Sequence, residues 1–485
     1  MHYVINKLKS QIEKQKATLL DDEGSLSIES LLSSDKFQSI INNCRSFRSR
    51  FYTPFVTLIL FIRQVLSPDK SCKNTVATFL ASVSTEDNNN IPSSNTGPYC
   101  KARQKLPIET LESLVKLSGD SLSKSSNARW KIYNREVKLI DGTSLTMADS
   151  EENQSRYPQH DAQKAGAGFP IMRLVAIMSL TTGGIIDYAV GAYKGKGTGE
   201  HALLRQIKDS IHKDDIVMGD RYFPCFFVMG DLQSIGADGI FKAHSQRKYD
   251  FRKGRKLGSK NHLVIWKKPH KPDWMTQETY DSYPDQMTVR EFKIKGEVYV
   301  TTFQDHKKYN KVALANHYKQ RWHIEINFNS LKTIMSMDHL RSKTPDMVHK
   351  EIAVHFLAYN LIRTLIAEAC RNTERLPIQV SFKGVIQLFN SFVSLLSFSA
   401  DCNKAHAILL HAIIKNKVGN RPGRIEPRAV KKRPKAFRRL NKSRELERKR
   451  RYLGRYFAHP MMQNRRAKRD DYKPSAVRVT QRYVP

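Results

Sequence analysis

The spacing of apolar residues predicts helices over the first quarter of the chain. Apolar positions recur every three or four residues in SIESLLSS and in FYTPFVTLILFIRQVL, and the pattern continues to about Ala128. A polar run, TEDNNNIPSSNTGP at residues 85–98, separates the earlier helices from the later ones. We therefore expect residues 1–130 to form a helical N-terminal domain.

From Arg135 the pattern changes to that of strands. EVKLIDGTSLTM alternates and is rich in β-branched and aliphatic residues, and PIMRLVAIMSL and IIDYAVGAYK follow, separated by a TTGG turn. Three strands in a meander, followed by alternating helices and strands, predict a mixed sheet flanked by helices. The later elements are expected as a helix from about Glu200 to Ile211, a strand at 216–220, a helix at about 228–235 and a strand at 239–244.

Residues 246–312 interrupt this alternation. The basic segment QRKYDFRKGRK precedes LVIWKK, MTVREFKI and EVYVTTF, which predict a separate antiparallel set of strands. A long helix is expected to begin near Asn316. We expect an α/β domain over residues 131–368 with the strand set inserted into it, and then a C-terminal helical region and basic arm over residues 369–485.

The charge of the chain points to a polyanionic partner. The 485 residues carry 82 lysines and arginines against 46 aspartates and glutamates, a formal charge of +36. The last 71 residues, 415–485, contain 25 of these cations and 5 of the acids, a net +20, so we expect an arm that follows a phosphate backbone. The cations of YCKARQKLP, residues 99–107, could meet phosphates or could belong to a solvated helix face.

Two other features of the composition bear on the compartment. The six cysteines show no spacing typical of a zinc site, so we interpret them as reduced thiols. The N-terminus has no apolar export segment, and the longest apolar run, Phe55 to Ile62, is too short to span a bilayer. We therefore expect a cytoplasmic protein without a membrane partner.

Two acidic residues follow predicted strands. Asp141 comes after VKLI, and Asp220 comes after IVMG. Ligands of α/β sheets collect where the C-terminal ends of neighbouring strands meet, so both acids are expected to face one crevice. Taken singly, Asp141 could instead form the turn in DGT, and Asp220 could cap the following helix.

The helix expected around HYKQRWHIEINFNSLKTIM carries the strongest signal. Its residues Tyr318, Arg321, Glu325 and Lys332 fall on one narrow face at about 100° per residue. Beside them runs an apolar stripe that would seat the helix on the sheet, made of Ile324, Phe328, Leu331 and Met335. The alternative is a solvated face on which Arg321 and Glu325 form an ordinary i,i+4 pair.

This spacing resembles a known signature. Tyr318-x2-Arg321-x3-Glu325-x6-Lys332 resembles the Y-R-E-K motif of bacterial DDE transposases of the insertion-sequence-four family, and IDGT and GDRYF resemble the segments that hold its two aspartates. The resemblance extends from YCKARQKLP to RPGRIEPRAVKKRP, and Tyr222 departs from it, because a glycine is commoner there. It implies a ribonuclease H-like catalytic core with a β-strand insertion between the second aspartate and the glutamate.

The chemistry of phosphodiester transfer agrees with these residue types. Two divalent ions can stabilise the attacking and leaving oxygens, and carboxylates are the side chains that Mg2+ prefers. Asp141 would bridge two Mg2+ ions, with Mn2+ as a substitute, and Asp220 and Glu325 would each complete one. Arg321 and Lys332 would hold phosphates beside the scissile bond. By resemblance, Tyr318 contacts phosphate near the cut.

The resemblance further implies an activity and partners. We expect a homodimer that binds double-stranded DNA in part through its N-terminal domain, cleaves the terminal inverted repeats of its own element and joins the 3′-hydroxyls to target DNA. A cut-and-paste route through a DNA hairpin is expected, in a bacterial cytoplasm and on the nucleoid when DNA is bound. The alternative is a catalytically inactive relative that acts as a sequence-specific DNA-binding regulator.

Tryptophans and histidines outside the signature carry weaker signals. An expelled base in the hairpin route could stack on a tryptophan. The sequence does not choose among Trp266, Trp274 and Trp322, and packing explains each of them as well. The scattered histidines, including His201 and His355, have no metal-binding or triad context.

Overall fold

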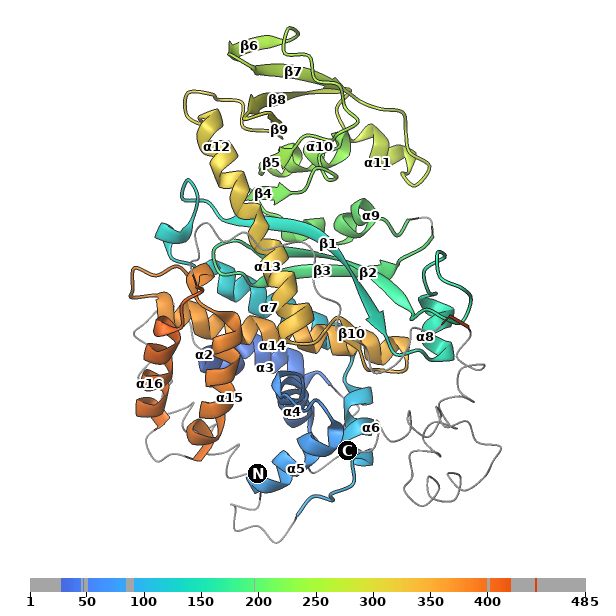
Figure 1. Ribbon diagram of the computed structural model, residues 1–485, viewed down its shortest axis with the longest axis vertical. Helices are drawn as coiled ribbons and strands as arrows, with labels where there is room; N and C mark the ends of the chain where they lie inside the picture. The colour runs from blue at the N-terminus through green and yellow to red at the C-terminus, as the bar shows by residue number, and fades with distance from the viewer. Residues whose placement is uncertain are drawn as a thin grey trace, which may run out of the picture.

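The computed structural model describes residues 28–44, 47, 51–83, 91–195, 197–398, 402–419 and 441–442. Within these residues, six helices form the N-terminal part, and a short 3-10 turn, Ala128–Trp130, leads from them into the sheet (Figure 1). Their bounds are α2 Ile28–Ser33, α3 Asp35–Asn42, α4 Pro54–Leu66, α5 Cys72–Val83, α6 Gly97–Lys105 and α7 Ile108–Lys124. The start of α4 follows from its sequence, since the Thr53 side chain accepts a hydrogen bond from the Val56 N–H and Pro54 occupies the first turn.

The basic segment of residues 99–107 is only partly a solvated helix face, and its phosphate contact stays a prediction. Tyr99 is buried and donates a hydrogen bond to Gln64 Oε1 at 2.8 Å, and the Arg103 guanidinium lies 4.8 Å from the Phe61 ring centroid. Lys101 and Lys105 remain exposed. Arg103 therefore stabilises the helical domain, whereas Lys101 and Lys105 lie at its surface.

Five strands form the predicted mixed sheet in the order β3-β2-β1-β4-β5. β1 pairs antiparallel with β2, β2 pairs antiparallel with β3, and β4 and β5 run parallel to β1. Helices connect the parallel strands, and the TTGG segment forms the turn between β2 and β3. The bounds are β1 Val137–Met147, α8 Glu151–Arg156, β2 Ile171–Ser179, β3 Ile185–Ala192, α9 Glu200–Ile207, β4 Ile216–Gly219, α10 Phe226–Ile235 and β5 Asp238–Lys242, and a 3-10 turn, Lys208–Ser210, follows α9.

The inserted strands are antiparallel but not separate, so that part of the prediction was wrong. They are β6 Arg255–Gly258, β7 Asn261–Lys267, β8 Gln286–Ile294 and β9 Glu297–Thr301, with α11 Gln277–Asp281 between β7 and β8. β9 pairs antiparallel with β5, and the sheet continues as β5-β9-β8-β7-β6 (Figure 1). This pairing satisfies the backbone groups of β5, which would otherwise form an open sheet edge.

The signature residues lie on a helical run that begins earlier than predicted and is not one regular α-helix. It starts at Lys311, where the Asn310 side chain accepts the Val312 N–H at 2.8 Å. α12 (Lys311–Tyr318) passes through a 3-10 turn (Lys319–Trp322) into α13 (His323–Asn329), and a π turn (Ser330–Ile334) ends the run. The two-residue strand β10, His339–Leu340, then pairs with the far end of β1.

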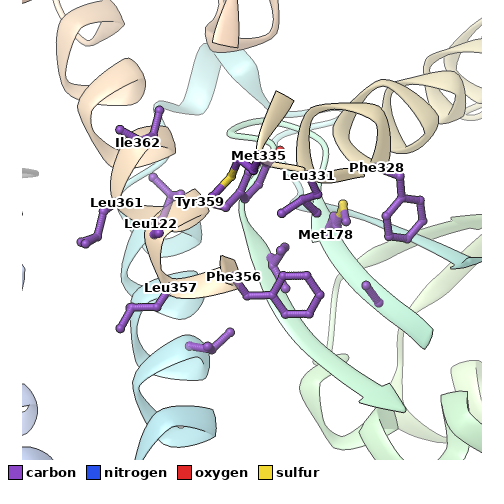
Figure 2. Packing of buried hydrophobic residues seen from close by; sticks show 14 of the residues in the cluster. Leu122, Met178, Phe328, Leu331, Met335, Phe356, Leu357, Tyr359, Leu361 and Ile362 are labelled. Atoms are coloured by element: carbon purple, nitrogen blue, oxygen red, sulfur yellow. The ribbon is translucent and has the colours of Figure 1, made fainter. Parts of the chain in front are cut away.

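A long core helix, α14 (Pro345–Cys370), packs against both the N-terminal helices and the α/β part of the molecule. Figure 2 shows its Phe356, Leu357 and Tyr359 among Leu122 of α7, Met178 of β2 and the apolar residues of the signature run. In the part of the chain that the structure describes, α14 is the one helix long and apolar enough to cross a membrane, and 94% of that stretch is buried inside the protein. The sequence prediction overlooked this helix, which is a core helix here.

The remaining described elements are helical. A 3-10 turn at Pro377–Gln379 precedes α15 (Phe382–Phe398) and α16 (Cys402–Lys415). Of the six cysteines, Cys44, Cys72, Cys100, Cys225 and Cys370 lie at described positions as free thiols. Of the predicted basic arm, residues 415–419 and 441–442 are described, and the rest lies outside the described residues.

Candidate functional site

Asp141 and Asp220 lie at the same level of two adjacent parallel strands. The register of β1 and β4 pairs Val137 with Ile216 and Leu139 with Met218. Asp141 and Asp220 are each two residues further along, so the same register brings them opposite each other just where β4 ends. The two strands therefore present both acids at the C-terminal end of β4, where ligands of α/β sheets collect.

The structure excludes the two simpler explanations of these acids. β1 continues to Met147, and Asp141 pairs with Ala176 of β2, so Asp141 belongs to a strand and not to a turn. α10 begins at Phe226 after Cys225, so Asp220 does not cap it. Instead, Asp220 Oδ1 accepts the Tyr222 N–H at 2.8 Å, which holds the loop after β4.

Burial and several neighbouring charges shift the pKa of Asp141. Burial raises its pKa to about 6, because the carboxylate loses hydration. The Gly142 N–H, which donates to Oδ1 at 2.8 Å, and the Arg321 guanidinium oppose this shift of the Asp141 pKa. The carboxylates of Asp220 and Glu200 raise the same pKa further.

The signature residues face β1, as their shared helical face predicts. Arg321 donates from Nη1 to Asp141 Oδ2 at 3.3 Å and from Nη2 to Glu325 Oε1 at 2.7 Å. The i,i+4 pair is therefore present, but it is not a solvated one, because the Arg321 side chain is only 15% exposed and also reaches β1. Lys332 Nζ donates to Thr143 Oγ1 at 3.1 Å and to the Ser144 carbonyl at 3.0 Å.

Tyr318 and the apolar stripe anchor the same run. The Tyr318 hydroxyl is buried and donates to the Gly219 carbonyl at 3.0 Å, directly before Asp220. Burial raises the Tyr318 pKa to about 12, so the hydroxyl keeps its proton at neutral pH. The predicted apolar stripe is buried, and Figure 2 shows three of its members beside Met178 of β2; these are Phe328, Leu331 and Met335.

Sequence reasoning missed Glu200, the first residue of α9. The absence of a side chain at Gly142 leaves room for its carboxylate, because a β-carbon there would come within 2.3 Å of Glu200 Oε1. Glu200 thus lies against the residue that follows Asp141, 59 residues from that acid in the chain, and its charge raises the Asp141 pKa. No spacing in the sequence links the two, because only the path from β3 through α9 brings them together.

The tryptophans differ in their environments. Trp266 is buried and donates its indole N–H to Glu291 Oε1 at 3.0 Å, so it belongs to the packing of the insertion. Trp274 lies under the Arg205 guanidinium, 3.5 Å from the ring centroid. Trp322 is 59% exposed and follows Arg321 directly.

The acids provide oxygen ligands but do not form a finished metal site. Among the residues that the structure describes, no three Asp, Glu, His or Cys side chains lie close enough together to hold a metal ion as they stand. Arg321 engages both Glu325 and Asp141, and the like charge of Asp220 raises the pKa of Asp141. Oxygen donors and unbalanced negative charge fit a hard divalent cation such as Mg2+.

Comparison with known proteins agrees with this geometry. Residues 133–361 match the family model described as a transposase DDE domain, a span that contains Asp141, Asp220 and Glu325. The chain is also similar to the transposase InsG for insertion sequence element IS4 of Escherichia coli (strain K12), with 24% identity over 250 residues. That match covers 50% of this chain and 55% of InsG, so the chain spans about half the length of this curated relative. Over residues 133–361 the chain is therefore similar to transposases of the DDE type.

Proposed function

We propose that the chain is a DNA transposase that cleaves the ends of its own insertion sequence and joins the freed 3′-hydroxyls to target DNA. The observation that carries this proposal is the register of β1 and β4, which brings Asp141 and Asp220 opposite each other, with Glu325 tied to Asp141 through Arg321. The strand order β3-β2-β1-β4-β5 supports a ribonuclease H-like core for this chemistry.

Asp141, Asp220 and Glu325 are the residues that would hold two Mg2+ ions, or Mn2+ in their place. When bound, such ions stabilise the charge that develops on the attacking and leaving oxygens of the phosphodiester. Asp141 is central to the assignment, because its carboxylate borders both Asp220 and the Arg321–Glu325 pair. Glu325 would join the other two acids once Arg321 releases it.

The cations of the signature run would act on the DNA. Arg321 presents a bidentate donor that suits a phosphate as well as a carboxylate, and it lies between two of the proposed ligands. Lys332 reaches β1 from the π turn and contacts Thr143 and Ser144, just beyond Asp141, where it would neutralise a neighbouring phosphate. Tyr318 holds the backbone before Asp220, and its predicted phosphate contact would need its hydroxyl to leave the Gly219 carbonyl.

The cut-and-paste route through a hairpin is the finer part of the proposal. Trp322 is the best candidate to receive an expelled base, because its ring is exposed and adjoins Arg321 in the chain. Two copies of the chain would pair the two ends of the element in the active complex, in the bacterial cytoplasm and on the nucleoid.

Strand cleavage of terminal DNA tests this function. The purified protein is incubated with labelled DNA carrying the inverted repeats that flank its gene, with Mg2+ or Mn2+, and compared with Asp141→Asn, Asp220→Asn and Glu325→Gln. We expect each variant to bind the DNA as the wild-type protein does and to lose at least about 1,000-fold in cleavage rate. Sequence-specific binding without any cleavage by the wild-type protein would instead support a DNA-binding regulator.

A further inference from the structure

A fourth carboxylate borders the proposed acids on the side away from the signature helix. Glu200 begins α9, and its Oε1 would lie 2.3 Å from a β-carbon built on Gly142. All three atoms nearest to that position belong to the Glu200 side chain. Gly142 follows Asp141 in β1 and donates its N–H to Asp141 Oδ1, so Glu200 lies against the backbone that orients Asp141.

The Glu200 carboxylate lacks a balancing partner. Within the described ranges of the chain, no hydrogen bond or ion pair to this carboxylate is present. Arg173 is the cation that acts on Glu200, but its Nη1 donates to the Thr198 carbonyl at 3.1 Å and its guanidinium lies over the Tyr193 ring. A half-buried carboxylate beside two others is costly unless a cation joins them.

We propose that Glu200 is a fourth acidic ligand of the metal site, acting on the ion between Asp141 and Asp220 directly or through an ion-bound water. Mg2+ keeps several waters when proteins bind it, and a carboxylate at the edge of a site can reach the ion through one of them. Gly142 is then a positioning residue, because only a residue without a β-carbon leaves room for Glu200 beside Asp141. This inference rests on the proposed function.

The competing role for Glu200 is structural. An acidic side chain in the first turn of a helix interacts favourably with the helix dipole, and no side chain caps α9 at Gly199. That role predicts that removing the charge lowers the melting temperature and leaves metal affinity unchanged. The two roles therefore differ in a measurement that needs neither DNA nor turnover.

Measuring Mn2+ binding to the full-length protein by electron paramagnetic resonance or calorimetry separates the metal-binding role of Glu200 from the structural one. The variants are Glu200→Gln, Glu200→Asp, Gly142→Ala and Asp141→Asn. The matched control is Glu151→Gln, which removes an exposed glutamate from the same position, the first residue, of α8. We expect Glu200→Gln to weaken Mn2+ binding by about 10-fold or more and Glu151→Gln to leave it unchanged.

The other variants test the geometry. Glu200→Asp keeps the charge but shortens the side chain, so it should also weaken binding, whereas a purely long-range effect of charge would leave its affinity normal and overturn the assignment. Gly142→Ala should weaken binding by displacing the carboxylate, and it keeps the test decisive if Glu200→Gln folds poorly. If Glu200→Gln and Gly142→Ala both bind Mn2+ normally while Asp141→Asn loses Mn2+ affinity, the proposed role of Glu200 is rejected but the metal site stands. Normal affinity in Asp141→Asn would reject the metal site of the proposed function itself.

Discussion

Arg321 donates a hydrogen bond to Asp141 at 3.3 Å, which ties the signature run to the central strand across 180 residues of sequence. The same guanidinium holds Glu325 at 2.7 Å. One cation of the protein thus lies between two of the three acids proposed to bind metal. Metal ions at these carboxylates would compete with Arg321 and would free it to bind phosphate.

Replacing Arg321 with alanine should separate metal binding from the handling of DNA ends. Mn2+ affinity should stay the same or rise, because a competing cation is gone, whereas the steps after first cleavage should slow by roughly 100-fold. Single-turnover rates on precleaved ends and a gel-shift assay on uncut ends measure the two effects. Lys319→Ala is the matched control, since Lys319 is an exposed cation on the same run whose Nζ bonds Asn316. A large fall in affinity for uncut ends with normal later rates would assign Arg321 to general DNA binding.

The raised pKa of Asp141 should give the metal-free protein a characteristic pH dependence. The folded-state pKa of about 6 lies above the ordinary value of about 4, so the folded protein binds this proton more tightly than the unfolded chain does. Protonation of Asp141 therefore stabilises the folded protein fully below about pH 4. This contribution to the free energy of unfolding, at most about 3 kcal/mol, is lost as the pH rises through about 6.

Urea unfolding in EDTA from pH 4 to pH 7 measures this loss as the difference between the wild-type protein and Asp141→Asn. The subtraction removes the contributions of groups that titrate alike in both proteins. A difference that stays constant over this range would mean that Asp141 ionises normally in the folded protein.

The elements of the site were predictable because burial imposes a period on the sequence. The strands before Asp141 and Asp220 and the face shared by Tyr318, Arg321, Glu325 and Lys332 follow from local patterns that the structure keeps. The apolar stripe placed the helix against the sheet, but the sequence did not predict the hydrogen bond between Arg321 and Asp141.

Other features depend on contacts that no local pattern encodes. β9 pairs with the edge strand β5 of the main sheet. An alternating strand pattern is the same whichever sheet the strand joins, so the sequence could not predict this pairing. α14 is buried on nearly all sides, and its apolar and polar residues do not separate into two faces, so it shows little helical periodicity, although it carries much of the core. Glu200 approaches Asp141 only through the fold of β3 and α9.

A buried arginine should make Asn327 important for stability. Arg363 of α14 is 4% exposed, and its guanidinium donates to Asn327 Oδ1 at 2.6 Å and to the Tyr359 hydroxyl at 2.8 Å. Asn327→Ala leaves a buried N–H of a charged group unpaired, so it should lower the free energy of unfolding by roughly 2 kcal/mol.

Denaturant unfolding checks this prediction against Asn329→Ala, an exposed asparagine two residues further along the run. We expect that control to change the free energy of unfolding by less than about 0.5 kcal/mol. Equal effects of the two substitutions would show that the Arg363 contact does not stabilise the position of α13.

Deletion of residues 421–485 tests whether the basic arm follows phosphates. The segment is rich in arginine, lysine and proline and, apart from Asn441 and Lys442, lies outside the described residues, so the expectation comes from its charge. The deletion should strongly reduce affinity for DNA of any sequence and flatten its salt dependence, because each neutralised phosphate adds about 0.9 to the slope of log affinity against log salt. Asp141, Asp220 and Glu325 all precede the deletion, so residual cleavage at low salt should persist. An unchanged salt slope with a collapsed melting temperature would mean that the stretch from Ser443 to Phe457 packs on the protein or on a second copy.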